Sequence, residues 1–163
     1  GIMAGSQGTM NNFVWGNGDM QNYETICGGS GAGLNFNGCS GVQTHMTNTR
    51  STDPEILEFR FPVRVEEMSI RVGSGGDGKF TGGDGITRRL RFLDQMTVTT
   101  LCSHRRVPPK GLNGGKNGEV GREWIERQSG IIDRHNGNDQ NELYPGDVFV
   151  MQTPSGGGFG NKN

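Results

Sequence analysis

The chain has 163 residues, of which 30 are glycine and 6 are proline. Inside a helix, glycine costs about 1 kcal/mol and proline about 3 kcal/mol relative to alanine, so this composition excludes a mostly helical protein. The formal net charge of −1 and the sequence pI of about 6.3 give no long-range attraction for nucleic acid or an anionic membrane surface. We therefore expect neither nucleic acid nor a membrane as a partner.

The sequence lacks the usual marks of a membrane or secreted protein. No apolar run approaches the roughly 20 residues that a membrane-spanning helix needs, and the N-terminal residues lack the basic and apolar regions of a signal peptide. The three cysteines, Cys27, Cys39 and Cys102, are odd in number and form no CxxC pair. Because this pattern indicates neither a disulfide framework nor a zinc site, we interpret them as reduced thiols and expect a cytoplasmic protein.

The chain divides by composition into a Gly/Asn-rich polar region at residues 1–50 and a β-rich region at residues 51–163. Apolar residues in the first region are spaced too widely for a long helix, which favours short extended segments joined by turns. The second region opens with a helix signal: Asp53 can cap, Pro54 suits the first helical position and Glu55 favours the positive end of the helix dipole. We expect a short helix over residues 54–59.

From residue 61 the apolar period changes to two. Val63 and Val65 share one face, and after an interruption at Glu66 and Glu67 the alternation resumes in the opposite phase, which predicts a strand with a β-bulge.

Further alternating segments predict additional strands later in the chain. Residues 86–93 and 96–103 are separated by two polar residues and are interpreted as a hairpin, and residues 133–142 as a polar surface loop. Two more strands are expected, at residues 122–127 and 148–153. Short strands with turn signals between them predict a mostly β protein, an antiparallel sandwich-like or barrel-like segment with glycine-rich loops and one short helix.

Several glycine runs require interpretation. The run GGSGAG at residues 28–33 is not a GxGxxG fingerprint, and GGKN at residues 114–117 lacks the Ser or Thr of a nucleotide-binding GK[ST] motif. Close backbone packing or tight turning is therefore favoured over phosphate binding. The tail at residues 153–160 is either a flexible end or a segment docked where backbones approach closely.

The segment THMTNTR at residues 44–50 concentrates chemistry-bearing side chains. We select His45 as a proton carrier and Asn48 and Arg50 as groups that orient a ligand, because imidazole titrates near neutral pH and guanidinium binds carboxylates through two hydrogen bonds. Glu24 is selected for polarising water or orienting a partner group. A hydrogen-bonded polar strand that fixes neighbouring loops is the alternative for residues 44–50.

Taken together, these motifs resemble the C-terminal portion of the hydantoinase B/oxoprolinase family. The matching stretches run in the family's order over nearly the whole chain and include GSQGTMNN, YETICGGSGAG, THMTNTR, TDPEILE, FPVRVE, GSGGDGKFTGGDG, PPKGLNGGKNGEVG, YPGDVF and TPSGGGFG. Two positions depart from the family pattern: Asn22 stands where a second Tyr is expected, and Ser155 where a Gly is expected. Neither change removes a candidate catalytic group.

The resemblance implies part of an ATP-dependent hydrolase that opens a cyclic amide such as 5-oxoproline or a hydantoin. It also implies three partners: a hydantoinase A-type ATPase subunit or domain, the N-terminal part of the hydantoinase B portion and a small cyclic amide substrate. ATP and a divalent metal are expected in the complete enzyme, and this segment is expected to bind no cofactor or metal and to be inactive alone. We also expect an oligomer.

Two alternatives remain open on the sequence. The chain could be a non-catalytic structural and assembly module, whose glycine motifs serve close packing. It could also belong to a related ATP-dependent carboxylase subunit with a different substrate channel.

Overall fold

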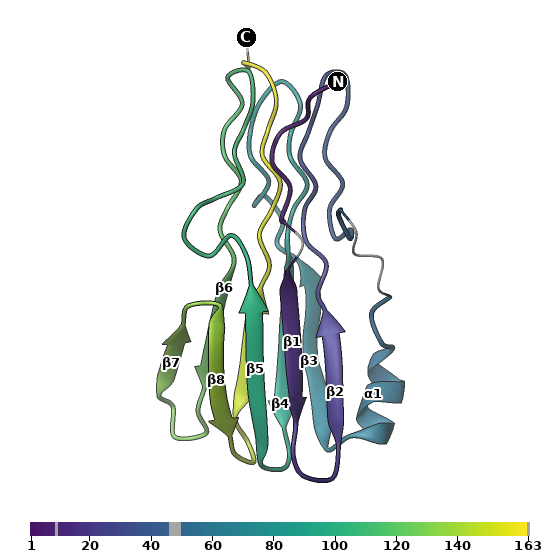
Figure 1. The fold of residues 1–163 in the computed structure, drawn as a ribbon, viewed down its shortest axis with the longest axis vertical. Coiled ribbons are helices and arrows are strands. Elements are labelled where there is room, and N and C mark those ends of the chain that lie inside the picture. The colour runs from purple at the N-terminus through teal and green to yellow at the C-terminus, as the bar shows by residue number, and fades with distance from the viewer. Residues whose placement is uncertain (9, 46–49, 163) are drawn as a thin grey trace.

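The computed structural model describes residues 1–8, 10–45 and 50–162, which form two antiparallel sheets and one helix (Figure 1). One sheet has the strand order β2-β1-β5-β8, and the other has the order β3-β4-β9-β6-β7. The strands are β1 (Asn11–Gly16), β2 (Gln21–Thr25), β3 (Val63–Ile70), β4 (Ile86–Phe92), β5 (Met96–Cys102), β6 (Arg122–Glu126), β7 (Ile132–His135), β8 (Asn138–Leu143) and β9 (Val148–Gln152).

The prediction of a mostly β, sandwich-like fold with one short helix is confirmed. Within the described residues the two sheets stay open and do not close into a barrel. Apolar side chains of both sheets meet between them: the rings of Phe13 and Phe149 stack with centroids 4.7 Å apart, and Trp15 packs edge-on against Phe92 at 5.6 Å. Trp15 and Phe92 are fully buried, so the centre of the sandwich is a close-packed apolar core.

Strand β3 contains the predicted bulge. Its pairing with β4 shifts between Val65 and Glu67, so the side-chain alternation changes phase there. Before the shift Val65 faces Leu90, and after it Met68 faces Arg88. Leu90 and Arg88 are inward-facing residues of β4. Because of the bulge, each of them lies opposite an uncharged residue of β3, Val65 or Met68.

Helix α1 (Pro54–Arg60) forms where the capping signals predict it. The Asp53 carboxylate accepts a hydrogen bond from the Glu55 amide at 2.9 Å, and Pro54 occupies the first turn. Leu57 is fully buried, which ties the helix to the core. The helix therefore owes its position to one anchoring side chain and a complete N-cap.

Two predictions about chain path are wrong. Strands β4 and β5 do not form a hairpin: they lie in different sheets, and Asp94 and Gln95 carry the chain between the layers. Both strands have an apolar face, and these faces cover each other across the core. Residues 133–142 are also not a loop, because they contain most of β7 and β8. Their polar composition reflects edge positions in the two sheets, where few side chains are buried.

Extended glycine-rich segments continue from one end of the sandwich, and both chain ends lie at the far end of this region (Figure 1). We call this region the glycine bundle and define it as residues 3–8, 28–42, 73–85, 108–118 and 153–160.

The bundle has a hydrogen-bond pattern unlike that of a sheet. Gly156, Gly157 and Gly158 donate their amide hydrogens to the carbonyls of Gly83, Gly5 and Lys116 at 2.8, 2.8 and 2.9 Å. Three successive amides thus reach three different neighbouring segments, as expected for an extended chain with three residues per turn, whereas successive amides of a β-strand alternate between two sides.

This pattern settles the two possibilities for the tail. Residues 153–159 are buried in the bundle, so the tail is docked. A Cβ atom on Gly156 would lie 1.8 Å from the carbonyl oxygen of Ser30, so only glycine fits this approach. In the described residues, no helix is long and apolar enough to cross a membrane.

Candidate functional site

A buried ion pair joins the two sheets beside the segment that contains the predicted site residues. Glu24 lies near the end of β2, and Arg88 lies in the middle of β4. The Arg88 Nη2 atom donates to both carboxylate oxygens of Glu24 at 3.0 Å, and the two side chains are only 2% and 5% exposed for Arg88 and Glu24. The pair is therefore a desolvated contact across the sandwich.

The electrostatics of this pair reflect its burial. Burial raises the pKa of the Glu24 carboxyl, and the charge and hydrogen bonds of Arg88 oppose that rise. The Arg88 Nη1 atom lies 3.3 Å from the Met68 sulfur, and its buried Nε has no hydrogen-bond partner among the described residues. Removing one partner would leave the other buried and unpaired, which is costly.

The polar segment around residue 45 is anchored close to this pair on both sides of its undescribed part. The Gln43 amide donates to the Thr25 carbonyl at 2.8 Å, next to Glu24 in β2. The Thr44 hydroxyl donates to the Gly8 carbonyl at 3.0 Å. On the other side, the Ser51 hydroxyl contacts the sulfur of Met68, which in turn contacts Arg88. The described residues on either side of this part thus contact β2 and β3, which are edge strands of the two sheets.

The four predicted site residues differ in how exposed they are, and one of them lies outside the described residues. His45 is exposed, has a positive φ of 59° and lies with its Nδ1 atom 3.2 Å from the Thr44 hydroxyl. Arg50 is exposed, Glu24 is buried in its ion pair, and Asn48 lies outside the described residues. His45 and Arg50 are therefore open to solvent, whereas Glu24 is buried.

Arg88 is a residue that the sequence reasoning missed. It occupies an inward position of β4, where Ile86, Leu90 and Phe92 are the apolar residues of the same alternation. A charged residue in register with buried apolar neighbours signals a buried partner of opposite charge. That signal was available, although it does not identify Glu24 as the partner.

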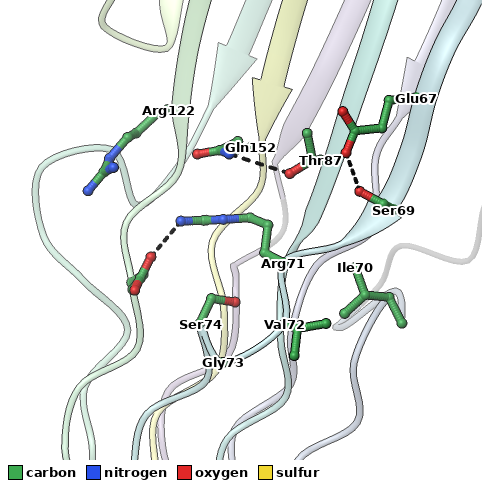
Figure 2. Close-up of a pocket in the computed structure, with 11 residues that line it drawn as sticks. Glu67, Ser69, Ile70, Arg71, Val72, Gly73, Ser74, Thr87, Arg122 and Gln152 are labelled. Atoms are coloured by element: carbon green, nitrogen blue, oxygen red, sulfur yellow. Dashed lines mark hydrogen bonds and ion pairs between the residues drawn. The ribbon is translucent and has the colours of Figure 1, made fainter.

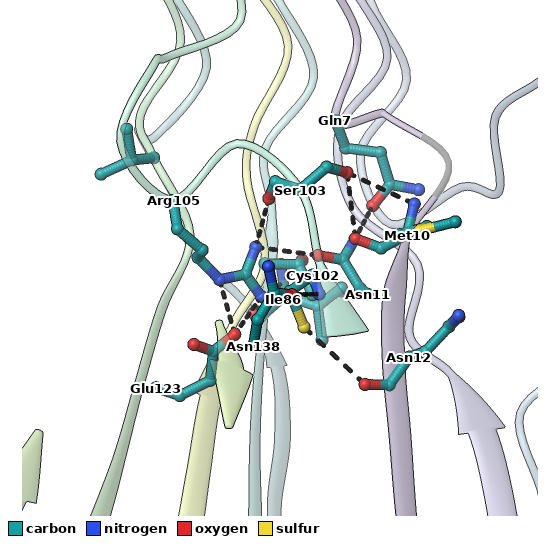
Figure 3. A network of polar contacts seen from close by, with 12 residues as sticks. Gln7, Met10, Asn11, Asn12, Ile86, Cys102, Ser103, Arg105, Glu123 and Asn138 are labelled. Atoms are coloured by element: carbon teal, nitrogen blue, oxygen red, sulfur yellow. Dashed lines mark hydrogen bonds and ion pairs between the residues drawn. The ribbon is translucent and has the colours of Figure 1, made fainter. Parts of the chain in front are cut away.

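A second buried network connects β6 to the start of β1 and is shown in Figure 3. The Arg105 guanidinium forms an ion pair with the fully buried Glu123 and donates to the Asn11 side chain at 3.0 Å. Asn11 donates to Gln7 at 2.6 Å, and Gln7 donates to the Val42 carbonyl at 3.2 Å. This chain of contacts reaches the backbone at Val42, two residues before the polar segment.

Cys102 lies beside the same network and is not a reactive thiol. Burial raises the pKa of its thiol, which keeps the sulfur protonated at neutral pH.

The depression in Figure 2 lies where the bundle leaves the five-stranded sheet and encloses about 380 Å³. Arg71 borders it and is fixed by three partners: its guanidinium donates to the Thr153 carbonyl at 2.6 Å and the Val120 carbonyl at 3.3 Å, and it pairs with Glu119 at 2.7 Å. Because these partners already occupy Arg71, we interpret this residue as a clamp between the bundle and the sheet.

The glycine run at residues 28–33 does not fit a phosphate loop. The amides of Gly29, Ser30 and Ala32 donate to the carbonyls of Pro154, Cys39 and Gly157 within the bundle, at 2.9 to 3.1 Å. Groups already paired in this way cannot cradle a phosphate.

The described side chains also do not fit a metal centre. Over residues 1–8, 10–45 and 50–162, no three His, Cys, Asp or Glu side chains lie together as a metal ion requires. We derive no step through a metal.

Comparisons with known proteins give a consistent result. The model of the hydantoinase B/oxoprolinase family matches residues 1–162. The chain is 48% identical over 163 residues to the 5-oxoprolinase of Dictyostelium discoideum, a match that covers 100% of this chain and 13% of that protein. It is 43% identical over 178 residues to the 5-oxoprolinase of Saccharomyces cerevisiae, covering 98% of this chain and 14% of that protein.

The fold has a counterpart among solved structures. The crystal structure of ATP-dependent caprolactamase from Pseudomonas jessenii matches with a TM-score of 0.79 at 24% identity, covering 98% of this chain and 30% of that chain. At this identity the match concerns the fold alone. The chain spans only 13% to 14% of the length of the two curated relatives.

Proposed function

Because the chain belongs to the hydantoinase B/oxoprolinase family, we propose that it forms part of the substrate side of an ATP-dependent enzyme that hydrolyses the C–N bond of a cyclic amide. The observation that carries this proposal is the 48% identity to a 5-oxoprolinase along the whole chain. The chain corresponds to a small part of that relative, so the proposed activity is that of the complete gene product with its partners. The 163 residues alone are proposed to be inactive.

In this proposal the other parts of the enzyme supply the activation. A hydantoinase A-type ATPase, as a subunit or a fused domain, would use ATP to turn the amide into a better electrophile, and the N-terminal part of the hydantoinase B portion would complete the site. This chain's share is to position the substrate and exclude competing water.

The proposed roles follow from where the side chains lie. His45 and Arg50 are exposed, so a substrate can reach them: Arg50 would hold an oxygen of the substrate, and His45 would carry a proton to or from the leaving nitrogen. Asn48 is proposed to help orient the same substrate. Glu24 is paired with Arg88, so we propose that it orients this partner rather than polarising water.

The proposal is tested on the complete gene product together with its ATPase partner. ATP-dependent hydrolysis is measured with 5-oxoproline, hydantoin and caprolactam as substrates, and at least one ring should open only when ATP is present. His45→Ala should then lower turnover tenfold or more. His104→Ala is a suitable control, because His104 is an imidazole outside this segment, whose Nδ1 lies 2.8 Å from the Val107 carbonyl.

Absence of ATP-dependent ring opening with all three amides would contradict the proposed reaction. Parental turnover in a normally folded His45→Ala variant would contradict the proposed site while leaving the reaction class standing.

The alternative of a structural and assembly module has one observation in its favour. The chain on either side of this segment is tied to β2 through Gln43, to Gly8 of the glycine bundle through Thr44 and to β3 through Ser51, as a segment that fixes neighbouring loops would be. On this alternative, substitutions at His45 and Arg50 change assembly or the melting temperature and leave the activity per assembled complex intact.

A further inference from the structure

The surface around β6 and β7 holds more arginine than its carboxylates neutralise. Four carboxylates there already have an arginine partner: Glu119 with Arg71, Glu123 with Arg105, Glu126 with Arg89, and Asp133 with Arg127. Asp139 lies 2.8 Å from the imidazole Nδ1 of His135. Arg106, Arg122 and Arg134 are exposed, and none of their three side chains has a hydrogen-bond or ion-pair partner among the described residues. In a chain of net charge −1, this is a local excess of positive charge.

Strand register places two of these arginines around an indole. Trp124 in β6 lies directly opposite Arg134 in β7, so both side chains are on one face of the sheet. Arg122 lies two residues before Trp124 and therefore projects from the same face. Residues on a diagonal across two strands are about 7–8 Å apart, which long side chains such as Arg122 and Arg134 can span.

The third side of this arrangement is polar. Gln152 of β9 lies opposite Arg122, so its amide borders the same surface. In Figure 2 the Arg122 guanidinium points away from Arg71 and from the other labelled residues, and Arg122 is exposed. Arg122 is thus presented to solvent from a rigid, paired strand.

Two small depressions meet at these residues. One of about 280 Å³ is bordered by Arg122, Trp124, Arg134 and Gln152, and a second of about 240 Å³ shares the first three and adds Arg106. Both are smaller than the usual 300 to 1,000 Å³ of a pocket for a drug-sized ligand, so they suit a group of a few atoms.

The one carboxylate at the edge of the larger depression does not cancel its charge. Glu126 accepts two hydrogen bonds from Arg89 at 2.8 and 2.6 Å, and these hold the pKa of Glu126 below its usual range. It also accepts the Trp124 indole N–H at 3.1 Å. Glu126 therefore holds the indole in place, and Arg89 neutralises the charge of Glu126.

We propose that Arg122, Arg134 and Trp124 form a binding site for a small oxyanion, the carboxylate or phosphate group of a small molecule. Guanidinium groups bind these oxyanions through two parallel hydrogen bonds. The Gln152 amide donates one hydrogen to the Thr87 hydroxyl at 3.4 Å, and its second hydrogen is a neutral donor for the ligand. The flat indole supplies an apolar wall for the rest of the ligand. A folded acidic protein would need a larger surface than two depressions of this size. The evidence for this site is the local excess of positive charge and the strand register, so the proposal does not depend on the proposed hydrolase activity.

The test uses the complete gene product and two probes, inorganic phosphate and glutarate, titrated by calorimetry at constant ionic strength in a chloride background. Saturable binding of at least one probe is expected, and whichever binds identifies the group that the site prefers. The double variant Arg122→Ala, Arg134→Ala should weaken that binding tenfold or more. Arg64→Ala is the matched control, because Arg64 is an exposed arginine of β3 on the far edge of the same sheet, and its side chain also has no partner among the described residues.

Three results would overturn the proposal, two from the titrations and one from a protein interaction. One is binding of both probes no stronger than that of chloride, and the other is binding that the double variant leaves at the parental strength. Loss of an interaction with another protein in the double variant, with ion binding unchanged, would show a protein interface and would also overturn it. Each of these results is independent of the hydrolysis assay.

Discussion

In the sandwich, side chains fill the space between neighbouring layers, whereas in the glycine bundle the backbones of neighbouring segments touch. Trp15, Leu90 and Phe92 are fully buried between the sheets. In the bundle, by contrast, an added Cβ on Gly29 or Gly156 would lie within 2 Å of a backbone oxygen. The sandwich is therefore specified by which side chains are present, and the bundle by where they are missing. Substitutions should reveal this difference directly.

The largest loss of stability is expected when a single methyl group is added to the glycine bundle. In Gly156→Ala the new Cβ would meet the Ser30 carbonyl at 1.8 Å, and the rigid backbone there cannot yield cheaply. We expect a loss of more than about 5 kcal/mol in the free energy of unfolding. Gly18→Ala is the control, because Gly18 has no atom within 4 Å of such a Cβ, and its effect should stay within about 0.5 kcal/mol.

Hydrogen exchange of peptides from this chain, measured in the complete gene product, checks this prediction. Gly156→Ala should speed exchange throughout residues 153–160 and in the segments that pack against them. Equal protection in the two variants would show that the bundle tolerates side chains after all.

A smaller effect is expected for the buried ion pair of the sandwich. Arg88→Met leaves the Glu24 carboxylate buried without a partner, which should cost about 3–5 kcal/mol. Adding Glu24→Leu to that variant removes the uncompensated charge, so the double variant should be more stable than the single one. Denaturant titration of both variants checks this order, and a double variant less stable than Arg88→Met would contradict it.

The smallest change in stability is expected when the pH is lowered, and we expect it to be confined to the sandwich. Burial of Asp147 opposes its ionisation, but hydrogen bonds from the Tyr144 and Gln128 amides and from Arg127 leave the pKa of this carboxyl below its usual value. A group whose pKa is lower in the folded state stabilises the protein above the unfolded value, about 3.9 for Asp, and loses this contribution as the pH falls through the folded value.

Asp147→Asn provides the measurement. Its stability difference from the parent should be largest near pH 7 and should shrink as the pH falls below about 4. A difference that stays constant from pH 7 to pH 3 would show that ionised Asp147 contributes nothing specific.

Local signals predicted the parts of the fold that depend on local chemistry. The Asp53 cap and Pro54 predict the helix, and the phase change around Glu66 predicts the bulge, because each depends on neighbouring residues alone. The hairpin prediction at residues 86–103 failed for the opposite reason: alternation shows that a strand has an apolar face, and not which sheet it joins. Strands β7 and β8 were missed because polar edge strands lack an apolar alternation.

The site was predictable only in part. The composition of THMTNTR marks His45 and Arg50, and the structure places both at the surface. Arg88 could have been recognised from its inward register, but its pairing with Glu24 joins residues 64 positions apart in the chain. The cluster of Arg122 and Arg134 likewise arises from strand pairing. Contacts of this kind depend on tertiary structure and leave no local pattern.

The most direct test of the proposed function is the turnover of Arg50→Ala, expressed per assembled complex, for the ATP-dependent hydrolysis of the preferred cyclic amide. Arg60→Ala serves as the control, because Arg60 is an exposed arginine at the end of α1. We predict that Arg50→Ala assembles like the parent and turns over at least tenfold more slowly, while Arg60→Ala keeps the parental rate. Parental turnover per complex in Arg50→Ala, with any defect confined to assembly, would contradict a substrate-binding role and identify the chain as a structural module.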